Sequence, residues 1–161
     1  MMRTCVFPGS FDPITLGHVD MIRRAAACFD RVIVAVLHNP DKAGAFSVEE
    51  RLDMIRLACE EIPGVEVDAF GGLLADYLRQ TGIRTVVRGL RNDEDFAMEC
   101  PMAQLNRHLY PDMDTFFLMT DPALAHISSS AVKQIASFGG SVAGLVPPRI
   151  EELVSRRFSK S

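Results

Sequence analysis

The sequence predicts an α/β fold, a Rossmann-like, doubly wound sheet of five parallel strands in a single domain over residues 1–161. Short β-branched runs alternate along the chain with longer segments of helical periodicity, which is the pattern of βαβ units. The strand candidates are mostly apolar on both faces, as expected where helices cover both sides of a parallel sheet. No internal repeat, low-complexity segment or linker divides the chain, and right-handed crossovers leave few topologies.

Five short runs, mostly apolar, predict the strands. They are Thr4 to Phe7, Arg31 to Leu37, Val65 to Phe70, Thr85 to Val87 and Thr115 to Met119. Because all five belong to one parallel sheet, their carboxyl ends are expected at the same edge.

Helical periodicity fills the segments between these strands. The first helix is expected near Gly17 to Cys28. In the second, apolar residues recur from Val48 to Ile62 at spacings of four and three, which predicts a stripe that faces the core. Ser47, with Glu50 three residues later, forms a capping-box signature at its start. The third helix is expected at Leu73 to Thr81.

The fourth helix repeats this apolar spacing, and Asn92 can cap its start. Pro101 falls inside it, and a kink or break is expected there because proline removes a backbone donor and clashes with the preceding turn. The last two helices are expected at Ser129 to Phe138 and Pro148 to Phe158. The apolar residues of the fourth helix are Met98, Met102, Leu105 and Leu109.

The charge balance limits the class of ligand. The 161 residues include 17 Lys and Arg against 21 Asp and Glu, a formal net charge of −4. This balance argues against a broad nucleic-acid interface, because such binding needs many cations that neutralise phosphates. A small anionic ligand needs only a few well-placed cations and stays compatible with it.

The four cysteines and the hydropathy pattern indicate a reducing compartment. Cys5, Cys28, Cys59 and Cys100 contain no C-x-x-C pair, which favours buried, reduced thiols over a zinc site or disulfides. Pro8 and Gly9 interrupt the first apolar stretch, so no signal peptide is predicted. The longest apolar run is far too short to span a bilayer. These features predict a cytoplasmic protein.

The loops that follow the strands are where chemistry is expected, because ligands of doubly wound sheets bind there. The first loop contains neither G-x-G-x-x-G nor G-x-x-x-x-G-K-[ST]. Gly9 lets backbone approach a ligand, Ser10 offers a hydroxyl, and His18 falls in the first turn of a helix, where free N–H groups favour anions. The alternative is a plain turn at Gly9 and Pro13 with a polar helix start, and a lone histidine favours that alternative.

Three further loops add polar groups at the same edge. Serines at residues 128–130 begin a helix, and three of them exceed the need for a cap. Arg88 and Arg91 flank Gly89 after the fourth strand, and arginine suits bidentate phosphate contacts. Lys42 follows the second strand. Each loop alone also fits a cap or a solvated surface group, but the four together predict a polyphosphate site.

Two ordered motifs resemble the signatures of the nucleotidylyltransferase superfamily. They are Gly9 to Pro13 with Thr15 to His18, which resembles T/H-x-G-H, and Ile127 to Ser130, which resembles I-S-S-[ST]. From the first strand to the last helix the chain resembles the bacterial phosphopantetheine adenylyltransferase family. The segments that carry this resemblance are Asn39 to Lys42, Phe46 to Arg51, Arg88 to Arg91 and Asn106 to Leu109.

The resemblance implies a reaction and its partners. AMP would be transferred from ATP to 4′-phosphopantetheine, which forms dephospho-coenzyme A and pyrophosphate in coenzyme A biosynthesis. Mg²⁺ would act as cofactor on the ATP phosphates, without a metal site on the protein. The family forms hexamers, so a homohexamer is implied, as is binding of coenzyme A as an inhibitor. Neither nucleic acid nor a membrane is expected as a partner.

The resemblance also assigns roles to matching positions. His18 would stabilise the transition state, with Lys42 and Arg91 as further catalytic residues. Phosphopantetheine would be bound by Ser10, Lys42, Leu74 and Arg88. ATP would be bound by Ser10, Phe11, His18, Gly89, Leu90, Arg91, Glu99, Leu124, Ala125, His126, Ile127, Ser128, Ser129 and Ser130.

The implied reaction agrees with the polar groups found from the loops. The nucleophile is a substrate phosphate oxygen that attacks the α-phosphorus of ATP in line, so neither a covalent intermediate nor a strong base is required. The nearest alternative is another small-molecule nucleotidylyltransferase, such as one that adenylylates nicotinate mononucleotide, and Lys42 with Arg88 distinguishes the two. A non-catalytic nucleotide-binding module is disfavoured by His18 together with the serine loop.

Overall fold

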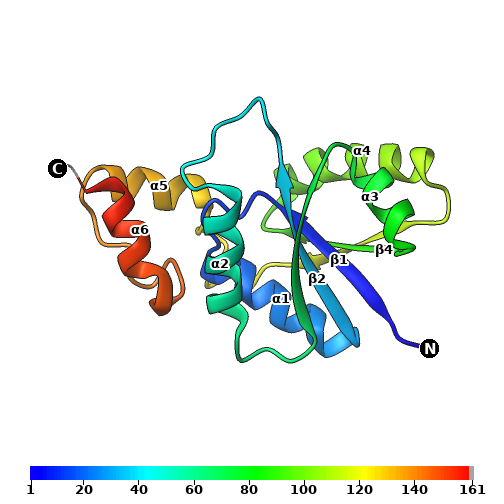
Figure 1. Cartoon of the computed structure of the whole chain (residues 1–161), viewed down its shortest axis with the longest axis horizontal. Coiled ribbons are helices and arrows are strands. Elements are labelled where there is room, and N and C mark those ends of the chain that lie inside the picture. The colour runs from blue at the N-terminus through cyan, green and yellow to red at the C-terminus, as the bar shows by residue number, and fades with distance from the viewer. Residues whose placement is uncertain (160–161) are drawn as a thin grey trace.

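The computed structural model describes residues 1–159 and contains a five-stranded parallel sheet in the order β3-β2-β1-β4-β5 (Figure 1). All five predicted strands are confirmed, each of them one to three residues longer than expected. Their bounds are β1 Thr4–Gly9, β2 Arg31–His38, β3 Val65–Gly71, β4 Thr85–Leu90 and β5 Asp114–Met119.

Burial on both faces holds only for the inner part of the sheet. In β1 and β2, four and five consecutive residues are buried, whereas β3 has one buried residue, Phe70, and β5 has none. The expectation that every strand is covered on both sides is therefore wrong for the two edge strands. An edge strand has a neighbour on one side only, so fewer side chains pack over it.

Helices cover both faces of the sheet and form two hydrophobic cores. On one face, α1 and α2 pack with the later α5 and α6 around side chains such as Val34 and Ile55. On the other, α3 contributes Tyr77 and Leu78 to a core with Val6. The helices are α1 Leu16–Cys28, α2 Val48–Cys59, α3 Leu74–Thr81, α4 Asp93–Leu109, α5 Ser129–Ser137 and α6 Glu151–Phe158, with a short 3-10 turn at Pro148–Ile150.

The predicted helix starts are confirmed by their caps. Ser47 Oγ accepts a hydrogen bond from the N–H of Glu50, whose carboxylate accepts one from the N–H of Ser47. Asn92 Oδ1 accepts one from the N–H of Asp95. These caps satisfy donors that have no partner in the first turn of a helix.

Helix α4 differs from the prediction in two ways. It runs unbroken through Pro101 to Leu109, so of the expected kink or break the break is wrong, and the kink stays a prediction. Ala97, whose carbonyl loses its donor at Pro101, is exposed, so water can satisfy it. None of its 17 residues is buried, and the apolar stripe that includes Met98 and Leu105 faces outward.

The cysteine prediction is half right. All four thiols are free of disulfides, but only Cys5 and Cys59 are buried, whereas Cys28 is exposed and Cys100 is half-buried. Cys28 ends a surface helix and Cys100 lies on α4, which explains why neither reaches a core. Burial raises the pKa of Cys59 to about 11, so this thiol stays protonated.

The strand order creates a switch point between β1 and β4. From β1 the chain first continues to β2 and β3 on one side, and later to β4 and β5 on the other. Helices after β1 and β4 thus lie on opposite faces, which opens a crevice at the carboxyl ends of these two strands. None of the helices within residues 1–159 is long and apolar enough to cross a membrane.

Candidate active site

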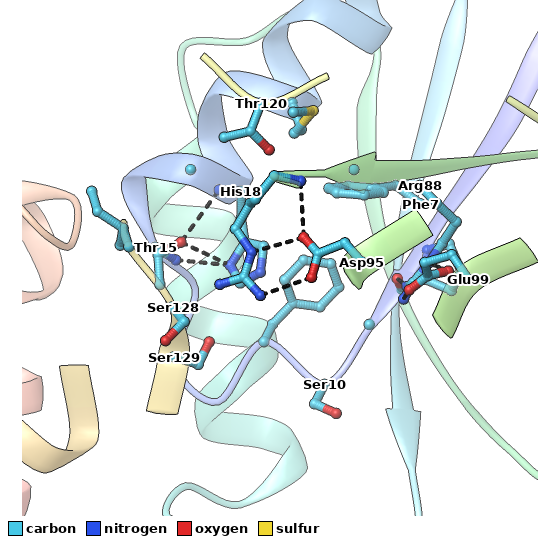
Figure 2. A pocket seen from close by; sticks show the side chains of 18 residues that line it. Phe7, Ser10, Thr15, His18, Arg88, Asp95, Glu99, Thr120, Ser128 and Ser129 are labelled. Carbon is cyan, nitrogen blue, oxygen red and sulfur yellow. Dashed lines mark hydrogen bonds and ion pairs between the residues drawn. The ribbon is translucent and has the colours of Figure 1, made fainter. Parts of the chain in front are cut away.

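A cavity of about 290 Å³ lies at this switch point. Residues 7–11, at the end of β1 and in the loop that follows it, form one wall, and Arg88, Gly89 and Arg91 at the end of β4 form another. Figure 2 shows Phe7, Ser10 and Arg88 among the side chains that line the cavity. The start of α5 closes a third side with residues 127–129. The sequence prediction that loops from several strands meet at one edge is confirmed for three of the four loops.

The loop after β1 is held in an unusual conformation. Phe11 has φ of 48°, in the left-handed region that L-residues other than Gly, Asn and Asp rarely adopt. Its ring is buried between those of Phe7 and His18, with centroids 5.7 and 5.0 Å away. A Cβ at Gly9 would lie 3.2 Å from the Phe11 ring, so glycine here makes room for this ring as well as for a ligand.

His18 is fixed by the first turn of its own helix. The N–H of Thr15 donates to its Nδ1 at 3.0 Å, while Thr15 Oγ1 accepts from the N–H of His18 at 3.3 Å. Histidine thus takes the place of the Glu in a capping box. Because Nδ1 accepts, the proton of the neutral ring lies on Nε2, which leaves that N–H as a donor for a ligand.

The surroundings keep this imidazole neutral. Burial, followed by the nearby charges of Arg88 and Arg91, lowers the pKa of His18 to about 4. A neutral imidazole serves as a hydrogen-bond donor rather than as a fixed charge. The cationic side chains that line the cavity are therefore the two arginines.

Arg88 joins the end of β4 to α4 and to β1. Its Nε and Nη2 donate to the two carboxylate oxygens of Glu99 at 2.8 and 2.5 Å, and Nη1 donates to the carbonyl of Pro8. The pair is only partly exposed, with side-chain exposures of 32% for Arg88 and 22% for Glu99. The guanidinium therefore lies at the junction of the walls, where a phosphate would meet it.

Arg91 forms a second bidentate pair with α4. Its Nε and Nη2 donate to Asp95 at 2.9 and 3.1 Å, and its backbone N–H also donates to this carboxylate. The Arg91 guanidinium holds the pKa of Asp95 below its ordinary value. Asp95 and Glu99 lie four residues apart on one face of α4, so a single helix orients both arginines.

The serines at the start of α5 have different roles. Ser128 is the N-cap and accepts from the N–H of Ala131, as one serine of the three was expected to do. Ser129 donates its hydroxyl proton to the carbonyl of Pro13 at 2.7 Å. Figure 2 shows both side chains on the side of His18 away from Arg88. The free N–H groups of the α5 N-terminus therefore border the cavity, a place that favours anions.

A second cavity of about 340 Å³ adjoins the first. The two share Pro8, Gly9, Ser10, Arg88 and Glu99 as lining. The rest of the second cavity is largely apolar and includes Leu37, Phe70, Leu73, Leu74, Val86 and Met102. Arg88 thus stands between a polar cavity and an apolar one.

The structure brings together most, but not all, of the predicted site residues. Leu74 lies in the second cavity. Lys42 is exposed on the loop between β2 and α2 and lines neither cavity. Leu90 is buried and lines neither cavity. The predicted residues that line the first cavity are Ser10, Phe11, His18, Arg88, Gly89, Arg91, Glu99, Ile127, Ser128 and Ser129; Leu124, Ala125, His126 and Ser130 do not.

Among the lining residues of the first cavity that were missed from the sequence, three lie outside residues 7–18. Asp95 follows Arg91 by four positions at a capped helix start, so a search for i,i+4 ion pairs would have found it. Thr120 directly follows β5 and is a polar residue at a carboxyl end. Met21, from α1, gives no signal in the sequence because it occupies an ordinary core position.

Comparison with known proteins gives relatives over the whole chain. The family model described as cytidylyltransferase-like matches residues 6–135. The phosphopantetheine adenylyltransferase of Clostridium tetani is 47% identical over 156 residues, which cover 97% of this chain and 98% of the relative. That of Dictyoglomus thermophilum is 48% identical over 157 residues, covering 98% and 96%.

A solved structure has the same fold. It is a proposed nicotinate-nucleotide adenylyltransferase from Vibrio parahaemolyticus, with a TM-score of 0.73 and 14% sequence identity. The match covers 99% of this chain and 98% of that chain. At this identity the likeness concerns the fold alone, and it confirms the predicted α/β class.

Proposed function

The chain belongs to the phosphopantetheine adenylyltransferases of the cytidylyltransferase-like family, and from this premise we propose that it adenylylates 4′-phosphopantetheine. The AMP group of ATP passes to the substrate phosphate, and the products are dephospho-coenzyme A and pyrophosphate. This places the enzyme in coenzyme A biosynthesis.

The two adjoining cavities are the observation that supports this function best. The polar cavity offers His18, Arg91 and the α5 N-terminus, which suits the triphosphate of ATP. The apolar cavity suits the uncharged pantetheine arm. Arg88 borders both, where the phosphate of phosphopantetheine would meet the α-phosphorus of ATP.

The residues of the site supply alignment and charge neutralisation. The attacking group is already a phosphate oxygen, so the protein has to hold two anions in line and stabilise the charge that develops between them. The Nε2–H of His18 donates to that charge, and Arg91 and Lys42 balance it. The pyrophosphate leaves from the side of the α5 N-terminus. No covalent intermediate is formed.

Magnesium accompanies ATP in this proposal. Both carboxylates of the cavity, Asp95 and Glu99, are already paired with arginines, which leaves hydroxyls and the ATP phosphates as oxygen ligands. Mg²⁺ keeps several waters and is commonly held by substrate phosphates and few protein groups, so this donor set fits it. The ion supplies charge neutralisation of the triphosphate.

A pyrophosphate-release assay tests the function. The protein is incubated with MgATP and either 4′-phosphopantetheine or nicotinate mononucleotide. Release with phosphopantetheine alone is expected, because the second cavity is largely apolar beyond Arg88 and suits an uncharged arm better than a charged nicotinate ring with its ribose. Release with nicotinate mononucleotide alone would favour the alternative nucleotidylyltransferase and reject the proposal.

Lys42→Ala is expected to raise the Kd for phosphopantetheine about 10-fold and to change that for MgATP less than 3-fold. The lysine follows β2, on the side of the apolar cavity, and one charge-assisted phosphate contact contributes about 1.5 kcal/mol. Titration calorimetry with each ligand separately measures the two values. Lys42→Arg, which keeps the charge, serves as the control, and an unchanged phosphopantetheine affinity in Lys42→Ala contradicts the role.

We further propose that the chains assemble as a homohexamer through α4 and β5. Several large apolar side chains there are 37–75% exposed, which is unusual for a surface that faces water. The residues are Phe96, Met98, Met102, Leu105, Leu109, Phe116 and Met119. A second copy of the chain would bury them.

Light scattering is expected to give a mass six times the 17.8 kDa of one chain. Leu105→Glu places a charge in the proposed interface and is expected to yield smaller species, whereas Gln104→Glu, on an exposed position of the same helix, leaves the mass unchanged. A monomeric unmodified protein contradicts the assembly.

The reaction is proposed to take place in the cytoplasm.

Coenzyme A and dephospho-coenzyme A contain the same pantetheine arm and adenosine as the two substrates. They are therefore proposed to bind across the same two cavities, as product or as inhibitor.

A further inference from the structure

Asp12 is a buried carboxylate that does not line the active-site cavity. It is 6% exposed, and it accepts hydrogen bonds from the N–H groups of Ala45 and Phe46, both at 2.9 Å. Lys133 Nζ lies 3.2 Å from its Oδ2. Burial would raise the pKa of Asp12, but the two N–H groups and the ammonium outweigh it and hold the pKa below its ordinary value.

These contacts join three segments that are far apart in the sequence. Asp12 belongs to the loop after β1, directly after Ser10 and Phe11. Ala45 and Phe46 end the loop that contains Lys42, and Lys133 belongs to α5, whose first turn borders the cavity. Asp12 is therefore the point where the loops that would hold both substrates meet.

The fit at this junction is tight. A Cβ at Gly44 would lie 3.1 Å from Asp12 Oδ2 and 3.0 Å from the carbonyl of Phe46. Ring packing adds to it, since Phe158 of α6 lies edge-on to Phe46 with centroids 6.3 Å apart. A shift of the Asp12 carboxylate would therefore move the segment that follows Lys42.

Lys133 would be assigned to phosphate binding from its place near a helix N-terminus, but the structure gives it another partner. It does not line either cavity, and its ammonium is directed at Asp12. The ion pair is largely shielded, with side-chain exposures of 34% for Lys133 and 8% for Asp12. The charge of Lys133 thus compensates a buried carboxylate.

We propose that Lys133 and Asp12 are positioning residues for the adenylyl transfer. They hold the loop between β2 and α2, which contains Lys42, against the loop after β1, which contains Ser10. This inference rests on the proposed function. Without the ammonium, Asp12 would be a buried charge with only two neutral donors, and water would enter to solvate it. The loop between β2 and α2 that contains Lys42 would then no longer be held at a fixed distance from the site, although none of the residues that would contact substrate has been changed.

A double-mutant cycle with Lys133→Met and Asp12→Asn tests the proposal. The kcat, and the KM values for phosphopantetheine and MgATP, are measured for each single variant and for the double variant. Lys133→Met is expected to raise the KM for phosphopantetheine about 10-fold and that for MgATP less than 3-fold. In the Asp12→Asn background the same change is expected to add less than 3-fold, because the carboxylate through which Lys133 acts is gone.

Two matched variants serve as controls. Lys133→Arg keeps the charge and is expected to restore the KM for phosphopantetheine to within about 3-fold of the unmodified protein. Gln134→Met changes an exposed neighbour on α5 and is expected to have no effect. Thermal unfolding of each variant is measured alongside, and Lys133→Met with Lys133→Arg decides the question if Asp12→Asn fails to fold.

Three results would overturn the inference. The first is unchanged kinetics in Lys133→Met, and the second is an equal rise of both KM values in this variant. The third is a full effect of Lys133→Met in the Asp12→Asn background, which would mean that the ammonium contacts substrate directly. Turnover by the unmodified protein tests the proposed function separately. An active enzyme that is indifferent to Lys133→Met rejects only the positioning role.

Discussion

Replacing His18 by alanine is expected to lower kcat by about 10²–10³, the usual loss for one transition-state donor, with smaller changes in both KM values. The Nε2–H faces the cavity because Nδ1 is occupied by the N–H of Thr15. It can therefore strengthen its hydrogen bond as charge develops on the phosphate. Steady-state and single-turnover kinetics measure the loss.

Two further substitutions separate the roles of the two ring nitrogens. In His18→Asn the side-chain oxygen can replace Nδ1 in the helix cap, but the amide does not reach the position of Nε2. In His18→Gln the amide can reach it. We therefore expect His18→Asn to be as stable as the unmodified protein and as slow as His18→Ala, and His18→Gln to recover part of kcat. Near-normal turnover in His18→Ala would remove His18 from the mechanism.

The protonation state of His18 can be measured in the free protein. Because its pKa is lowered to about 4, the ring stays neutral as the pH falls through 6.5, where an ordinary histidine becomes charged. Nitrogen NMR shifts of the imidazole are expected to report the Nε2–H tautomer from pH 8 to 5. A titration near 6.5 would show that the ring is solvated and that Arg88 and Arg91 do not act on it.

The elements of the fold were predictable where one local signal decided them. The strands were found because their short runs are mostly apolar, most completely in the buried β1 and β2, and the starts of α2 and α4 were found because Ser47 and Asn92 are side-chain caps. Helix α4 shows the limit of this reasoning. The spacing of Met98 and Leu105 predicts an apolar stripe, but spacing alone does not say whether a core or another chain covers it.

The site was predictable to the extent that strand ends determine it. Arg88 and Ser128 were found because they follow strands whose carboxyl ends must meet. Their partners were not found, because pairing depends on the orientation of α4 over the sheet, which places Glu99 against Arg88. For the same reason Asp12 looked like part of a turn, since its contacts with Ala45 and Lys133 span 33 and 121 residues.

Arg88→Met is expected to lower kcat/KM for phosphopantetheine by about 10²–10³. The guanidinium neutralises Glu99, to whose carboxylate oxygens its Nε and Nη2 donate at 2.8 and 2.5 Å. In the proposed reaction it would also bind the substrate phosphate. Its removal leaves a partly buried carboxylate that repels the incoming phosphate. Truncation of one partner of such a pair commonly costs about 2–5 kcal/mol, and about 1.4 kcal/mol corresponds to each factor of ten.

The double variant Arg88→Met with Glu99→Gln separates these two effects. If repulsion by Glu99 contributes, neutralising it is expected to recover about 10-fold of the lost kcat/KM, although the phosphate contact is still missing. Arg88→Lys keeps the charge but not the two-pronged geometry, and an intermediate loss is expected. A double variant no faster than Arg88→Met would show that Glu99 does not face the substrate phosphate, and the whole loss would then belong to the missing arginine contact.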